Sequence, residues 1–123
     1  MPDDNRTPMI SDQYLQRFSG LTRIYGVDAL ALLAQAHFCI VGVGGVGSWA
    51  AEAAARSGIG QITLIDHDDI EASNTNRQLH SLHSTLGQSK VSALAARILD
   101  INPECQCHAV DDLVTRSNLE NFI

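Results

Sequence analysis

A glycine-rich segment is the part of the sequence whose residue types and spacing point most directly to chemistry. Gly42-Val-Gly-Gly-Val-Gly47 fits the pattern G-x-G-x-x-G at positions 42, 44 and 47, with Gly45 as an additional glycine. In this pattern one glycine permits a tight turn, the next lets backbone amides approach a phosphate, and the last lets a helix and a strand pack closely. We assign the turn to Gly42, the phosphate approach to Gly44 and Gly45, and the close packing to Gly47.

An acidic residue and several polar and cationic residues follow the glycine segment. Asp66 lies 24 residues past Gly42, close to the ~20 expected for an acid that binds ribose hydroxyls. Asn74, Arg77 and Gln78 stand in SNTNRQ, and Lys90, the one lysine of the chain, ends GQSK.

A triphosphate needs its β and γ groups neutralised, which a guanidinium and an ammonium can do. The same two cations would stabilise the charge that builds when a nucleophile attacks the α-phosphate. We therefore predict that Arg77 and Lys90 are catalytic. The competing interpretation is that both are solvated surface charges.

The elements that must position these residues alternate between helix and strand. Helical periodicity covers residues 11–25, broken at Gly20 and Gly26, and then 27–36, 48–57 and 90–101. Short β-rich runs at 38–43, 61–65 and 105–110 are predicted strands, and residues 111–123 are predicted to begin another helix. This order predicts a Rossmann-like α/β fold with a doubly wound, mainly parallel sheet that is incomplete at its C-terminal end. We expect residues 1–10 to be a flexible tail and residues 11–123 to be the N-terminal part of a longer ATP-binding adenylation domain.

Composition excludes several classes of protein. The chain has 123 residues, of which 45% are hydrophobic, and this favours one soluble globular domain over a disordered or membrane-spanning chain. Fourteen acidic residues against eight basic ones give a net charge of −6, which argues against bulk binding of nucleic acid. The three cysteines, Cys39, Cys105 and Cys107, have neither disulfide nor metal spacing. We expect them to pack as small hydrophobes in a cytoplasmic protein.

The run IVGVGGVGSWAAEAAARSGIGQITLIDHDDIEASNTNRQ, followed by GQSK, resembles the E1-like adenylating enzymes, the ThiF, MoeB and HesA family, over residues 17–103. The resemblance implies a homodimeric, ATP-binding, Rossmann-like domain that activates a carboxylate as an acyl-adenylate and releases pyrophosphate. By the family's motif, Gly45 borders the phosphates and Asp66 holds the ribose. The residues implied to contact the triphosphate are Asn74, Arg77, Gln78 and Lys90. Mg²⁺ is an implied cofactor, and its aspartate ligand is expected beyond residue 123.

Within the family, RFSGLTRIYG and DHDDIEASNTNRQLHSLHSTLGQSK are similar to the branch that acts on N6-threonylcarbamoyladenosine at position 37 of tRNA. This similarity implies that ATP activates the carboxylate of that nucleoside and that its side chain then cyclises with loss of water. The implied partners are tRNA, a cysteine desulfurase and its sulfur acceptor. Because the chain is acidic, the tRNA-binding surface is expected from a C-terminal part or from the dimer. Membrane association through that C-terminal part is left open.

The sequence departs from the family's pattern at one position near the N-terminus. Many members carry RYSRQ near the N-terminus, whose second arginine reaches into the neighbouring subunit's site. Gly20 stands at that position here, so Arg17 or Arg23 is left as its substitute.

Three alternative functions are considered. The first is adenylation of a ubiquitin-like sulfur carrier, as in thiamine or molybdopterin synthesis. The second is an NAD-dependent oxidoreductase, which would have no use for Arg77 with Lys90, and the third is a chain that only folds or binds nucleotide weakly.

Several other polar and aromatic residues are predicted to have no role in a site. Trp49 is expected to pack, and His80 and His83 are expected to be exposed and passive. The remaining acids of the segment after Asp66 are predicted to be solvated rather than ligands of Mg²⁺. These acids are Asp68, Asp69 and Glu71.

Overall fold

The fold is given by a computed structural model that describes residues 10–122 of the chain. The flexible tail predicted for residues 1–10 therefore lies, except for Ile10, outside the described residues. The elements in chain order are α1 (Asp12–Phe18), η2 (Ser19–Leu21), α2 (Thr22–Tyr25), α3 (Asp28–Gln35), β1 (His37–Val41), α4 (Gly47–Arg56), β2 (Gln61–Asp66), η3 (Ala72–Asn74), η4 (His83–Thr85), α5 (Lys90–Ile101), β3 (Gln106–Asp111) and η5 (Leu119–Asn121), where η denotes a 3-10 helix.

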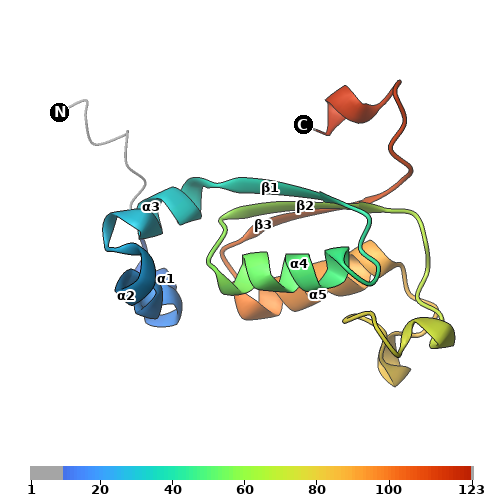
Figure 1. Cartoon of the computed structure of the whole chain (residues 1–123), viewed down its shortest axis with the longest axis horizontal. Coiled ribbons are helices and arrows are strands. Elements are labelled where there is room, and N and C mark those ends of the chain that lie inside the picture. Colours follow the sequence, from blue (N-terminus) through green and yellow to red (C-terminus); the bar gives the residue numbers. More distant parts are fainter. Residues whose placement is uncertain (1–9, 123) are drawn as a thin grey trace.

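The three strands form one parallel sheet in the order β1-β2-β3. In its register, Gln61 of β2 lies opposite His37 of β1 and Gln106 of β3. Parallel neighbours need crossover connections, and α4 and α5 provide them. Figure 1 shows both helices side by side on the same face of the sheet. The predicted Rossmann-like α/β fold is confirmed, and within residues 10–122 its crossover helices cover one face.

The main core lies between the sheet and these two helices. Ile62 and Leu64 of β2 meet Leu94 and Ile98 of α5 there, and all four are fully buried. An ion pair between Glu52 of α4 and Arg97 of α5, with 2.7 Å between Oε1 and Nε, links the helices at the surface.

The N-terminal helices have a small core of their own, which contains Tyr14, Phe18 and Leu30. The Tyr14 hydroxyl donates a hydrogen bond of 2.8 Å to the carbonyl oxygen of Gly58. Gly58 follows α4 with a φ of +75°, a conformation that glycine adopts without steric cost. This contact fastens α1 to the turn between α4 and β2.

The bounds of α5 follow from local chemistry. The Ser89 hydroxyl accepts a hydrogen bond from the N–H of Ser92 and caps the start of the helix. The helix ends before Asn102 and Pro103, because a residue that precedes proline is disfavoured in helical conformation. Lys90 is consequently the first residue of α5, as predicted.

Two expectations about the ends of the sheet are wrong. The strand predicted at 38–43 is β1, which spans His37–Val41, and Cys39 in this strand is only half-buried. Cys105 is buried and Cys107 packs partly buried against the same core, as expected.

The helix predicted from residue 111 is the other error. Asp111 ends β3, and up to Phe122 only the short η5 follows. Asn118 explains the difference, because its side chain accepts a 2.7 Å hydrogen bond from the N–H of Thr115 and donates one of 2.7 Å to the Leu113 carbonyl. Such bonds compete with helical backbone pairing.

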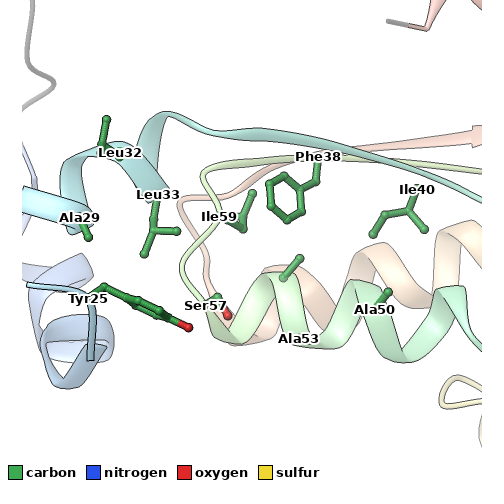
Figure 2. Close-up of a pocket in the computed structure, with 11 residues that line it drawn as sticks. Tyr25, Ala29, Leu32, Leu33, Phe38, Ile40, Ala50, Ala53, Ser57 and Ile59 are labelled. Carbon is green, nitrogen blue, oxygen red and sulfur yellow. The ribbon is translucent and has the colours of Figure 1, made fainter. Parts of the chain in front are cut away.

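An apolar groove runs between β1, α4 and the N-terminal helices, with a volume of about 730 Å³. Figure 2 shows Phe38 and Ile40 pointing from β1 toward Ala50 and Ala53 of α4. The groove offers almost no polar groups, so it provides no chemistry for a reaction.

Among residues 10–122, no helix combines the length and apolar character needed to cross a membrane.

Candidate functional site

The glycine segment connects β1 to α4 at the carboxyl end of the sheet. Gly42 has a φ of +86°, which fits the predicted tight turn. A Cβ added at Gly47 would overlap the carbonyl oxygen of Gly42 and lie 3.5 Å from Cγ2 of Ile40, so close packing requires glycine there. At Gly44 and Gly45 a Cβ would only make ordinary contacts with the side chains of Gln78 and Arg77. Their approach to a phosphate stays a prediction.

Three side chains hold the peptide groups of this segment. The Val43 N–H donates to Oδ2 of Asp66 over 2.9 Å, and Nε2 of His80 lies 2.7 Å from the Val43 carbonyl oxygen. The hydroxyl and the N–H of Ser48 both donate to the Gly44 carbonyl oxygen. Within the described part of the chain, no acceptor is found for the N–H groups of Gly44, Gly45 and Val46. Free amides at the start of a helix are suited to an anion.

A polar cavity of about 420 Å³ lies beside this segment. It is formed by the long connection between β2 and α5, which leaves the sheet at the carboxyl ends of β1 and β2 (Figure 1). In open α/β sheets this is the end at which ligands bind. The residues that line the cavity are Asp68, Asp69, Glu71, Asn74, Arg77, Gln78 and Lys90.

The structure thus brings together all four residues that the sequence assigns to a triphosphate, and the cavity also receives the three acids predicted to be solvated. Gly42 and Asp66 lie elsewhere, on a neighbouring cavity of about 220 Å³ that includes His67 and Val114. Arg17 and Arg23, the residues left as substitutes for Gly20, lie on α1 and α2 and line neither cavity.

Lys90 is an ammonium group held almost out of solvent. Its side chain is 8% exposed, and its Nζ lies 3.8 Å from Oδ2 of Asp68. That separation is a weak ion pair, and the partner carboxylate is 57% exposed. A nearly buried cation whose ion pair is long is well placed to meet a more highly charged anion.

Arg77 and Gln78 differ in how they are held. Arg77 is exposed, and its Nη1 donates to the Ser73 carbonyl over 3.2 Å and to Oδ1 of Asn76 over 3.0 Å. Gln78 is buried, and its Oε1 has no hydrogen-bond partner among the described residues. An unpaired buried oxygen is costly, and a ligand with a donor group would relieve that cost.

Three residues with a part in this site were missed or misjudged from the sequence. Trp49 is 53% exposed rather than packed, and its Nε1 donates to the Arg77 carbonyl over 2.9 Å. His80 is buried rather than exposed, whereas His83 is exposed as predicted. Ser48 and His80 carry no sequence signal of their roles, because both act on the backbone of a distant segment.

Asp66 is held in its charged form. Partial burial works against its charge, but hydrogen bonds from the N–H groups of Asp68 and Val43, together with the charge of Lys90, keep the pKa of Asp66 below its ordinary value. A carboxylate whose pKa is lowered by folding adds stability above its unfolded pKa, near 4. That stability is lost as the pH falls through the lower, folded value.

We therefore expect acidification to destabilise the parent chain more than its Asp66→Asn variant. Urea unfolding at pH 6 and at pH 3 measures this, and the parent should lose more of its unfolding free energy between the two. An identical loss in both proteins would show that the Asp66 carboxylate contributes nothing to the fold through its charge.

Comparisons with known proteins agree with this geometry. The model of the ThiF family matches residues 16–123. The tRNA threonylcarbamoyladenosine dehydratase of Escherichia coli K12 is 56% identical over 115 residues, which are 94% of this chain and 43% of that protein. A crystal structure of the E. coli tRNA N6-threonylcarbamoyladenosine dehydratase in complex with ATP superposes with a TM-score of 0.91, at 56% identity, over 94% of this chain and 47% of that one.

A more distant relative is the adenylyltransferase and sulfurtransferase MOCS3 of Drosophila willistoni. It is 33% identical over 99 residues, which are 80% of this chain and 22% of that protein. The chain spans less than half the length of each of these proteins.

Proposed function

The chain belongs to the ThiF family, and on that premise we propose that it forms part of an ATP-dependent enzyme that cyclises N6-threonylcarbamoyladenosine at position 37 of tRNA. The observation that carries the proposal is the polar cavity lined by Arg77 and Lys90, which adjoins the glycine segment where Arg77 and Gln78 border Gly45 and Gly44. The substrate is supported by the 56% identity to the E. coli protein named for this dehydration. The nucleotide is supported by the crystal structure of the E. coli dehydratase in complex with ATP.

In the proposed reaction the nucleoside's carboxylate oxygen attacks the α-phosphorus of ATP. The bond from that phosphorus to the bridging oxygen breaks, and pyrophosphate leaves with the bonding electrons. A nucleophile of the same side chain then attacks the activated carbonyl carbon and displaces AMP. One carboxylate oxygen stays on AMP and one proton is released, so the nucleoside loses the elements of water.

The residues of this chain would bind and neutralise the triphosphate. Lys90 and Arg77 would offset charge on the phosphates, while the amides of Gly44 and Gly45 would donate to phosphate oxygens. Gln78 and Asn74 would provide further polar groups on the lining of the cavity. Asp66, on the neighbouring cavity, would bind the ribose hydroxyls.

We propose that ATP enters with Mg²⁺, which would neutralise the triphosphate further. Mg²⁺ prefers oxygen ligands, and the carboxylates of Asp68 and Asp69 line the cavity. Although the sequence predicts these two acids to be solvated, their place on the cavity would let them act as partial ligands, together with the aspartate that the family resemblance implies.

Several wider assignments belong to this proposal. They are a homodimer, cooperation with a cysteine desulfurase and its sulfur acceptor, a cytoplasmic location, and the place of residues 11–123 as the N-terminal part of the adenylation domain. Adenylation of a ubiquitin-like sulfur carrier is less favoured, because the relative of that kind is 33% identical. The NAD-dependent alternative is disfavoured by the cations of the cavity.

Mass spectrometry of digested tRNA tests the proposal. The intact protein is incubated with ATP, Mg²⁺ and tRNA that carries threonylcarbamoyladenosine. We expect an ATP-dependent product that is lighter than this nucleoside by one water. An unchanged nucleoside, together with ATP–pyrophosphate exchange driven by a sulfur-carrier protein, would replace this function with the sulfur-carrier alternative.

A further inference from the structure

His80 is a buried polar residue for which the proposed reaction has no direct use. Its side chain is 3% exposed, and its one hydrogen bond joins Nε2 to the Val43 carbonyl oxygen over 2.7 Å. A carbonyl oxygen only accepts, so Nε2 must carry the hydrogen. Burial, reinforced by the nearby charge of Lys90, lowers the pKa of His80. The ring is therefore neutral, and Nδ1 is a bare acceptor.

That acceptor has no partner among residues 10–122. An apolar side chain of similar size would avoid the cost of a buried, unpaired nitrogen. A histidine at this position is thus explained by the hydrogen bond from its Nε2 to the Val43 carbonyl rather than by packing. That hydrogen bond holds one peptide group of the glycine segment.

The held peptide joins Val43 to Gly44. In a trans peptide the C=O and the N–H point in opposite directions, and no cis peptide occurs in the described chain. With the Val43 oxygen turned inward to His80, the Gly44 N–H must point the other way. Asp66 holds the preceding peptide and Ser48 the following one, so no adjacent peptide can rotate to compensate.

We propose that His80 is a positioning residue, which fixes the Val43–Gly44 peptide so that the Gly44 N–H is presented to a phosphate of the bound nucleotide. This inference rests on the proposed function, since it requires that ATP binds beside the glycine segment. His80 lines neither of the two cavities of the site and acts through the backbone of Val43.

Two substitutions at position 80 separate this role from packing. His80→Phe fills a similar volume without a donor. His80→Gln carries an amide N–H that reaches about as far as Nε2. Isothermal titration calorimetry on the intact protein then compares ATP with adenosine, which has the same base and ribose but no phosphate. His83→Phe, on the exposed η4, is the matched control.

We expect His80→Phe to weaken ATP binding about tenfold, the loss typical of one hydrogen bond to a charged group. Adenosine binding should stay within about twofold in the same variant. His80→Gln should recover most of the ATP affinity, and His83→Phe should leave both ligands unaffected. If the phenylalanine variant does not fold, His80→Asn replaces it, because its shorter amide cannot reach the Val43 carbonyl.

Equal weakening of ATP and adenosine, or unchanged binding of ATP, would overturn the positioning role. A parent protein that binds neither ligand would instead refute the proposed function. The two failures are therefore distinguishable in one set of titrations.

Discussion

Replacing Lys90 by alanine in the intact protein lowers the rate of ATP–pyrophosphate exchange by about 10²-fold or more, as is typical when one charge-stabilising donor is removed. The Lys90 ammonium is 8% exposed, and its ion pair with Asp68 is long, at 3.8 Å, so the ammonium can also interact with a bound triphosphate. Exchange measured with saturating carboxylate substrate reports the adenylation step alone. Arg77→Ala, on the same cavity, is expected to cause a loss of the same order.

Matched variants show whether charge or packing is responsible. Lys90→Met keeps most of the side-chain volume without the ammonium and should be as slow as Lys90→Ala. Arg56→Ala removes an arginine that is paired with Glu52 on the surface of α4 and should leave the rate unchanged. If neither Lys90→Ala nor Arg77→Ala slows exchange, the cavity does not bind the triphosphate.

Replacing Gly47 by alanine destabilises the fold by about 3 kcal/mol, at the upper end of the cost of overpacking a tight site. The added Cβ would overlap the Gly42 carbonyl oxygen, and neither residue can retreat, because Gly42 follows β1 directly and is hydrogen-bonded to Ile65 of β2, while Gly47 begins α4. The shift that relieves this overlap must displace the amides of the glycine segment. Urea unfolding measures the loss of stability, and ATP binding should fall in parallel.

Gly20→Ala is the control for this substitution. No atom lies within 4 Å of a Cβ at Gly20, so the unfolding free energy should change by less than about 0.5 kcal/mol. A Gly47→Ala variant that unfolds at the same urea concentration as the parent would contradict the close packing of α4 against the glycine segment.

The parts of the fold that were predictable are those whose signals are local. The bounds of α5 follow from a serine cap and a proline, and the turn at Gly42 follows from the conformations open to glycine. Residues 111–122 were misjudged because the side chain of Asn118 pairs with backbone groups, which periodicity does not register. The half-burial of Cys39 depends on which elements pack against β1, and no local signal carries that information.

The candidate site divides in the same way. Asn74, Arg77, Gln78 and Lys90 were found because their residue types suit a triphosphate and their segment follows the glycines. His80 was misjudged because its importance lies in a single bond to Val43, 37 residues earlier. A polar side chain that acts on a distant backbone leaves no trace in spacing or composition.

Because Lys90 is nearly buried and lines the polar cavity, chemical labelling of its ammonium group measures access to that cavity. Every other Lys or Arg position in the sequence is an arginine, and a guanidinium stays protonated under conditions in which amines react. Apart from the N-terminal amine, the Lys90 Nζ is therefore the one amine in the chain that an acylating reagent can modify. The rate at which acetic anhydride labels it will depend on how far the cavity exposes the Nζ, and a bound nucleotide should slow that labelling without any dye or introduced cysteine.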